Sequence, residues 1–140
     1  MRIREIMKTG SELVTCATSD FVTVAAKKME EHDVGTVLVT SKGKLKGIVT
    51  DRDLVLHVIA EGRDPGKTKL SEVMRVDLVV GKPDWDLSEA THVMAEKRVR
   101  RLPIERNGRL AGFVSLSDLA PIAQRELDRV LELEGYPAHP

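Results

Sequence analysis

Apolar residues recur with a helical period in each half of the chain. The first series begins at Val22 and the second at Leu87, and each places apolar residues three or four positions apart. That spacing gathers apolar side chains on one face of a helix. The pattern predicts two amphipathic helices, built on Val22, Ala25, Ala26 and Met29 and on Leu87, Ala90, Val93 and Met94.

Short apolar runs follow each of these helices and predict a β-hairpin. In the first half, residues 37–40 and 46–50 flank the turn sequence SKGK. In the second half, residues 102–105 and 111–115 flank RNGR, whose Asn-Gly pair suits a tight hairpin turn. Each half is therefore predicted to contain a helix followed by two antiparallel strands.

A second helix is predicted after each hairpin. The first runs from about Arg52 to Ala60 and is followed by a polar linker. The second begins near Ser117 and continues to about Gly135 and Pro137. Its apolar stripe is longer than one small unit can cover, so we expect the excess to pack on a partner subunit; the stripe consists of Leu119, Ile122, Leu127, Val130 and Leu131.

The two halves are copies of one unit. Residues 25–54 and 90–119, aligned at an offset of 65, share ten identities in thirty positions. Upstream, IREIM at 3–7 resembles LSEVM at 70–74 at an offset of 67. Such self-similarity indicates repeated supersecondary units that bury one another's apolar faces. The predicted domains are a first repeat at 1–62, a linker at 63–69, a second repeat at 70–125 and a helical extension with a tail at 126–140.

A polar motif closes each repeat where a strand turns into a helix. Gly47 precedes Thr50 and Asp53 in the first copy, and Ser115 and Asp118 repeat the arrangement in the second. A glycine permits close approach of another backbone or a flat ligand. The hydroxyl lies near free helix amides, which favour an anion, and the carboxylate offers two acceptor oxygens to adjacent ribose hydroxyls.

The same spacing also fits a capping box, in which the two side chains only satisfy free amides at a helix start. Capping and ligand binding are compatible, and the repetition of the motif with its preceding glycine favours binding. The second copy adds Arg100 and Arg101 at a helix-to-strand junction, where guanidinium groups can engage phosphate or form a solvated basic turn. The first copy has the uncharged Gly35 and Thr36 there.

Composition excludes several classes of function. Apolar residues make up 41% of the 140 residues, and 22 basic residues balance 22 acidic ones, so no nucleic-acid partner is expected. Cys16 is the only cysteine, which excludes an internal disulfide or a cysteine zinc cluster. The sequence contains neither a signal peptide nor an apolar run long enough for a membrane span. We therefore expect a cytoplasmic protein that does not bind membranes.

Catalytic and metal sites are not expected either. GRDPGKT at 62–68 imitates a phosphate-binding loop, but it has three residues between its glycines where that loop needs four, and it follows a helix. The four histidines lack close metal-ligand spacing. No nucleophile-elbow motif is present. The sequence predicts a non-enzyme without a bound metal.

These residues resemble a tandem pair of CBS domains, the Bateman module, over about residues 1–125. The resemblance lies in the IREIM and LSEVM segments, the hairpin with its glycine, and the closing Gly-x-(Val/Ile)-(Thr/Ser)-x-x-Asp motif. The chain is similar to small bacterial and archaeal CBS-pair proteins, including hypoxic-response proteins. The resemblance implies an α+β fold of two β-α-β-β-α repeats about a pseudo-twofold axis, dimerising into a disc.

The resemblance also implies adenosyl ligands in clefts between the repeats. It places Asp53 and Asp118 on ribose hydroxyls and Thr50 and Ser115 near ribose or phosphate. It further implies that Arg100 and Arg101 meet phosphate, and that the backbone around Val14, Gly35 and Val80 lines the base pocket. The ligand can be AMP, ADP, ATP, S-adenosylmethionine or a dinucleotide.

Two functions are compatible with this sequence. In the first, the protein is a homodimeric regulator whose adenosyl ligand alters its action on a partner protein that the sequence does not identify. In the second, it is a scaffold or stress protein that acts through protein–protein contacts with empty clefts.

Overall fold

The computed structural model describes residues 1–133 and Gly135 and divides the chain into two compact units. One unit consists of Thr9–Leu78 with Glu105–Ala111. The other consists of Met1–Lys8, Val79–Ile104 and the chain from Gly112 onward. Each unit therefore combines the body of one repeat with the opening segment of the other repeat. We define the opening segments as residues 3–8 and 70–75.

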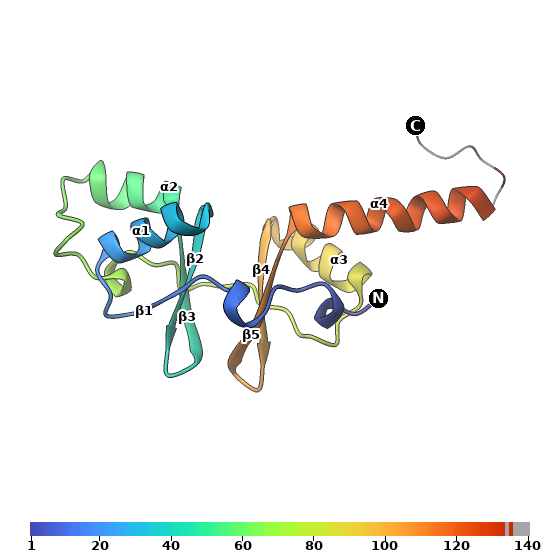
Figure 1. Cartoon of the computed structure of the whole chain (residues 1–140), viewed down its shortest axis with the longest axis horizontal. Coiled ribbons are helices and arrows are strands. Elements are labelled where there is room, and N and C mark those ends of the chain that lie inside the picture. Colours follow the sequence, from blue (N-terminus) through green and yellow to red (C-terminus); the bar gives the residue numbers. More distant parts are fainter. Residues whose placement is uncertain (134, 136–140) are drawn as a thin grey trace. The chain divides into compact units, whose positions relative to one another are not determined.

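The body of the first repeat contains three strands, a first helix and a second helix that continues from α-helical into π-helical geometry (Figure 1). Strand β1 pairs in parallel with β2, and β2 pairs in antiparallel with β3. Figure 1 shows α1 (blue) and α2 (green) side by side next to this sheet. The elements are β1 (Thr15–Ala17), α1 (Val22–His32), β2 (Thr36–Ser41), β3 (Lys44–Thr50), α2 (Asp51–Leu54) and the π-helical turn η3 (Val55–Ile59).

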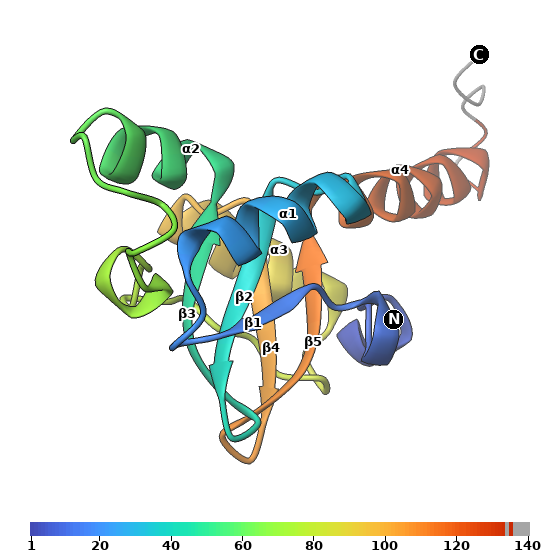
Figure 2. The same cartoon turned by 60° about the vertical axis from the view of Figure 1, so that its left-hand side comes forward.

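The body of the second repeat has the same helices and hairpin, drawn in yellow to red in Figure 2. Helix α3 packs against α4, and β4 pairs with β5. The elements are α3 (Leu87–Lys97), β4 (Arg101–Arg106), β5 (Arg109–Ser115) and α4 (Leu116–Leu133). Short 3-10 turns complete the chain: η1 (Ile3–Glu5), η2 (Gly10–Glu12) and η4 (Leu70–Glu72).

Both hairpin turns have the backbone geometry that their sequences predict. Lys42 and Gly43 have φ angles of 52° and 78°, and Asn107 and Gly108 have φ angles of 53° and 76°. Two consecutive positive φ angles define the type I′ turn, whose twist matches that of the flanking strands. The predicted hairpins are therefore confirmed.

The second repeat lacks a regular strand equivalent to β1. Only Gly81 forms a bridge there, parallel to Ile104, and its amide donates to the carbonyl of Pro103 at 2.8 Å. In the first repeat, the amide of Leu38 donates to the carbonyl of Val14. Pro103 is the equivalent of Leu38 and has no amide hydrogen, so the ladder cannot extend.

The apolar residues that recur in the sequence form the buried interior. In the first repeat they pack into one cluster that includes Val22, Ala25, Met29 and Leu70 of the second opening segment. Their equivalents in the second repeat, Leu87, Ala90, Met94 and Ile3, are also buried. An opening segment thus contributes one fully buried aliphatic side chain to each unit, which at roughly 25 cal/mol per Å² stabilises it by about 1.5–3 kcal/mol.

Helix α4 extends beyond the part that its unit buries. Leu119 is buried, whereas Leu127, Val130 and Leu133 are 51%, 54% and 84% exposed. The predicted end near Gly135 and Pro137 falls partly outside the described residues, as does most of the predicted tail. Within residues 1–133 and Gly135, no helix has the length and apolar character needed to cross a bilayer.

Candidate functional site at the strand-to-helix junctions

The closing motif forms a capping box in both repeats. The Thr50 hydroxyl accepts from the amide of Asp53 at 3.2 Å, and the Asp53 carboxylate accepts from the amide of Thr50 at 3.0 Å. Ser115 and Asp118 make the same reciprocal pair at 3.3 and 2.9 Å. Both motifs therefore form the capping box that the sequence predicted as an alternative to ligand binding. Capping uses only the Oδ2 atom of each aspartate.

The second carboxylate oxygen of Asp53 is already engaged. Its Oδ1 accepts from Nε and Nη2 of Arg75 at 3.1 and 2.9 Å, and Asp53 is only 1% exposed. Burial by itself raises the pKa of this carboxyl group, but hydrogen bonds from Arg75 and Thr50 outweigh burial and hold the pKa below its ordinary value. Asp53 is thus a buried, ionised and fully paired group.

Asp118 has a more open environment. Its side chain is 25% exposed, and the nearest cation is Lys8, whose Nζ lies 3.9 Å from Oδ1. That separation exceeds hydrogen-bond length, so the lysine contributes a weak, screened attraction. Asp118 therefore keeps a carboxylate oxygen that an incoming hydroxyl can reach.

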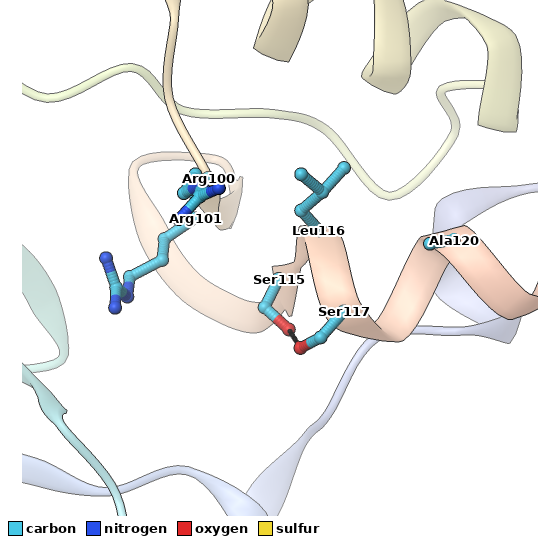
Figure 3. Close-up of a pocket in the computed structure, with 6 residues that line it drawn as sticks. All are labelled: Arg100, Arg101, Ser115, Leu116, Ser117 and Ala120. Carbon is cyan, nitrogen blue, oxygen red and sulfur yellow. Dashed lines mark hydrogen bonds between the residues drawn. The ribbon is translucent and has the colours of Figure 1, made fainter.

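A pocket of about 390 Å³ lies at the start of α4 (Figure 3). Arg100 and Arg101 approach it from the start of β4, and the hydroxyls of Ser115 and Ser117, 2.8 Å apart, lie at the start of the helix. The volume lies in the range of small-molecule sites. Two guanidinium groups and a helix N-terminus give this pocket a positive potential suited to an anion.

The equivalent junction of the first repeat has a different charge pattern. Gly35 and Thr36 take the places of the two arginines, and Asp51 takes the place of Leu116. The Asp51 amide donates to the Gly35 carbonyl at 2.9 Å, and its carboxylate lies where a side chain at Gly35 would project. An acidic group next to the junction disfavours phosphate there.

The other three residues predicted for the site lie just before paired residues: Gly35 precedes β2, and Val80 precedes the bridge at Gly81. Val14 precedes β1, and its carbonyl accepts from the amide of Leu38 at 3.0 Å. Val14, Gly35 and Val80 are half-buried. Their contact with an adenine ring stays a prediction.

Glycine at position 47 serves the approach of another protein segment. A Cβ atom at Gly47 would lie 2.6 Å from Sδ of Met74 and 2.8 Å from the carbonyl oxygen of Arg75. Gly112 in the second repeat faces Met7 and Lys8 in the same way. The close approach expected at this glycine is therefore made by the opening segment of the other repeat.

Sequence reasoning missed Arg75, Lys8 and Ser117 as parts of these sites. Ser117 lies in the closing motif, so its place at the start of a helix was a usable signal. Lys8 and Arg75 follow the paired methionines of the two opening segments, and this shared basic position was the available signal. Their contact with the closing aspartates could not be read from the sequence, because it joins segments that are 22 and 110 residues apart.

The described part of the chain offers no cluster of three or more histidine, cysteine, aspartate or glutamate side chains that could hold a metal ion. The side chains gathered at the junctions are instead hydroxyls, carboxylates and guanidinium groups. Such a set supports reversible binding of a polar ligand through hydrogen bonds and ion pairs.

Comparison with known proteins identifies both repeats. The CBS domain family matches residues 3–60 and 70–123. The CBS domain-containing protein YhcV of Bacillus subtilis is 42% identical over 118 residues, covering 84% of this chain and 82% of YhcV. Hypoxic response protein 1 of Mycobacterium tuberculosis is 35% identical over 119 residues, covering 84% of this chain and 81% of that protein.

Solved structures give the same result. The crystal structure of Hypoxic Response Protein I with two coordinated zinc ions superposes with a TM-score of 0.75 at 32% identity, covering 87% of this chain and 98% of that one. A CBS-domain protein of Burkholderia ambifaria MC40-6 named for signal transduction superposes with a TM-score of 0.76 at 30% identity, covering 88% and 93%. Both similarities extend over the two repeats.

Proposed function

Because the chain belongs to the CBS-domain family as a free-standing tandem pair, we propose that it is a regulatory module that binds an adenosyl ligand and signals to a partner protein. The proposal takes the protein to be a cytoplasmic non-enzyme. Its relatives YhcV and Hypoxic response protein 1 match over most of their own length, so they leave little room for an attached catalytic domain. The ligand is then a signal and is not consumed.

One observation carries the proposal. The basic pocket at the start of α4 lies at Ser115, and the capping box of Ser115 holds the partly exposed carboxylate of Asp118 in place. A nucleotide needs acceptors for its ribose hydroxyls and donors for its phosphate. The second repeat supplies the donors in the pocket lining, and it supplies the acceptor at Asp118, which lies outside that lining but is bonded to Ser115 at the same strand-to-helix junction.

The charges of this junction favour a phosphorylated ligand. Arg100 and Arg101 line the pocket, whereas no acidic residue does. Guanidinium groups pair with phosphate oxygens in a fork geometry, and the helix N-terminus adds to the attraction. AMP, ADP and ATP therefore fit better than S-adenosylmethionine, whose sulfonium group brings a positive charge.

We expect nucleotide to raise the unfolding temperature of ligand-free protein by about 3–5 °C at roughly a hundred times its dissociation constant. Calorimetric titration of AMP, ADP, ATP, S-adenosylmethionine and NAD then gives the affinities.

Asp118→Asn should weaken nucleotide binding by about 10- to 150-fold, because a charged hydrogen bond contributes about 1.5–3 kcal/mol. The amide can still accept from the Ser115 backbone, so the cap is kept.

A matched control separates local contacts from general charge. Arg101→Ala should weaken binding of the phosphorylated ligands and leave that of adenosine nearly unchanged. Arg106→Ala removes the same charge from the far end of β4, outside the pocket lining, and should leave binding as in the wild type. Saturable binding of none of the five ligands would contradict the regulatory proposal and favour the scaffold function.

The exposed part of α4 supports a second element of the proposal, a homodimer. Leu127 and Val130 are about half exposed on an apolar stripe that the unit leaves uncovered. We expect Leu127→Asp with Val130→Asp to halve the mass measured by analytical ultracentrifugation. Arg125→Asp, on the opposite face of the helix, should not change the mass. A wild-type protein that sediments as a monomer at about 50 μM would contradict the dimer.

Further assignments stay predictions. They are the role of Thr50 and Asp53 in ligand binding, the base contacts of Val14, Gly35 and Val80, the boundaries of the repeats and the disc-shaped assembly. The identity of the regulated protein is open to capture experiments with the dimer as bait.

A further inference from the structure

The two closing aspartates are equivalent in sequence but differ in access. Asp53 is 1% exposed, whereas the Asp118 side chain is 25% exposed. Both make the same capping box with the preceding hydroxyl residue. The two sites differ in what approaches the second carboxylate oxygen, which is Arg75 at Asp53 and Lys8 at Asp118.

The approaching residue is the last one of an opening segment, Arg75 or Lys8. Its backbone pairs with the equivalent strand position in both units. Arg75 exchanges two backbone hydrogen bonds with Ile48, at 3.0 and 2.9 Å. Lys8 exchanges two with Phe113, at 2.9 and 3.1 Å. Ile48 and Phe113 are equivalent positions at the 65-residue offset. The backbone pairing is thus the same in both units, and the side chain that it presents to the aspartate differs.

Arginine closes the first copy. Its planar guanidinium places Nε and Nη2 on Oδ1 of Asp53, while Oδ2 accepts from the Thr50 amide. Three donors therefore occupy the carboxylate, and its exposed area is nearly zero. A ribose hydroxyl would have to displace a charge-assisted pair to reach this group.

Lysine leaves the second copy open. The single ammonium group of Lys8 lies 3.9 Å from Oδ1 of Asp118, beyond hydrogen-bond distance, on a flexible aliphatic chain. It can move aside without breaking a direct hydrogen bond. The basic pocket is adjacent to this open copy, whereas the closed copy has Asp51 beside Gly35.

We propose that Arg75 closes the first repeat's copy of the site, so that each chain carries one ligand site, at Ser115 and Asp118. The residue that follows Met74 or Met7, arginine or lysine, then determines which copy accepts the ligand. This inference rests on the proposed function for its ligand. The closure of Asp53 is independent of any ligand.

The closure is tested by carbodiimide labelling of carboxylates with glycine ethyl ester, read by peptide mass spectrometry. In the wild type, Asp118 should be labelled at least tenfold faster than Asp53. Arg75→Lys and Arg75→Ala should bring the rate at Asp53 toward that at Asp118, and Lys8→Arg should protect Asp118. Equal labelling of the two aspartates in the wild type, or an unchanged rate at Asp53 in folded Arg75 variants, would overturn the closure. Circular dichroism establishes which variants are folded.

The consequence for binding is tested by calorimetric titration of AMP. The wild type should bind one AMP per chain, and Lys8→Arg should lower the affinity at least tenfold although it keeps the charge. Two equivalent sites per wild-type chain, or wild-type affinity in Lys8→Arg, would refute the single-site inference. If AMP does not bind and the labelling contrast is still found, the proposed AMP ligand fails while the closure by Arg75 stands.

Discussion

Asp53→Ala should lower the free energy of unfolding by about 2–4 kcal/mol, whereas Asp118→Ala should lower it by about 1 kcal/mol. Each variant keeps the hydroxyl half of its capping box and loses the hydrogen bond from the Thr50 or Ser115 amide to the carboxylate, which contributes about 0.5–1.5 kcal/mol. The Asp53→Ala variant also loses the pair between this carboxylate and Arg75, and hydrogen bonds to charged groups contribute about 1.5–3 kcal/mol. Because the Arg75 side chain is already 63% exposed, it returns to water and the loss stays below that of a fully buried pair. Urea unfolding measures both values.

The contribution of Asp53 should depend on pH in a defined direction. Its pKa in the folded protein lies below the ordinary value of 3.8, so the unfolded chain binds the proton more readily. The stabilisation is therefore complete above about pH 5 and is lost as the pH falls through the folded pKa. We expect the difference in stability between the wild type and Asp53→Asn to be constant near neutrality and to shrink below about pH 4. A difference that grows on acidification would contradict the paired, ionised state of Asp53.

Gly47→Ala and Gly112→Ala should each destabilise the protein by about 1–3 kcal/mol, the usual cost of overpacking. At Gly47 the new methyl group would lie 2.8 Å from the carbonyl oxygen of Arg75, and at Gly112 it would lie 2.9 Å from that of Lys8. The methionine at each contact can rotate away. The carbonyl oxygens cannot, because they accept hydrogen bonds from Ile48 and Phe113.

Gly66→Ala is the matched control for these substitutions. The nearest atom to its added methyl group is Oδ1 of Asp64 at 3.4 Å, so we expect a change within about 0.5 kcal/mol. Thermal unfolding of the three variants gives the comparison. If all three behave alike, the opening segments do not pack on the strands as described. Gly47→Ala should also increase labelling of Asp53, since it displaces the segment that carries Arg75.

Local patterns were sufficient to predict most elements of the fold. The three- and four-residue apolar spacing predicted α1 and α3, and the turn sequences predicted the two hairpins, because these structures depend on contacts between near neighbours. The first strand of the second repeat, implied by the family resemblance, is reduced to a bridge at Gly81. The strand is short because Pro103 has no amide hydrogen to donate. The sequence shows this proline, but only the structure shows that Gly81 pairs with it.

The candidate site was predicted in part. The aspartates, hydroxyls and arginines at the two junctions were recognised from the repeated motif, and the structure brings Arg100, Arg101 and Ser115 to one pocket. It also shows that the two copies are unequal. The sequence showed that only the second copy has the two arginines, but the closing motif could not reveal the different access to the two aspartates, since it is the same in both copies.

The sequence by itself determined that this protein is a repeated α+β unit with a polar junction in each copy, because periodicity and turn chemistry act over a few residues. Only the tertiary structure decided that each opening segment joins the body of the other repeat and sets Arg75 on Asp53 but Lys8 near Asp118. Burial and pairing of a charge depend on groups brought together by folding. The difference between an arginine fork and a lysine ammonium therefore becomes a difference between a closed and an open carboxylate.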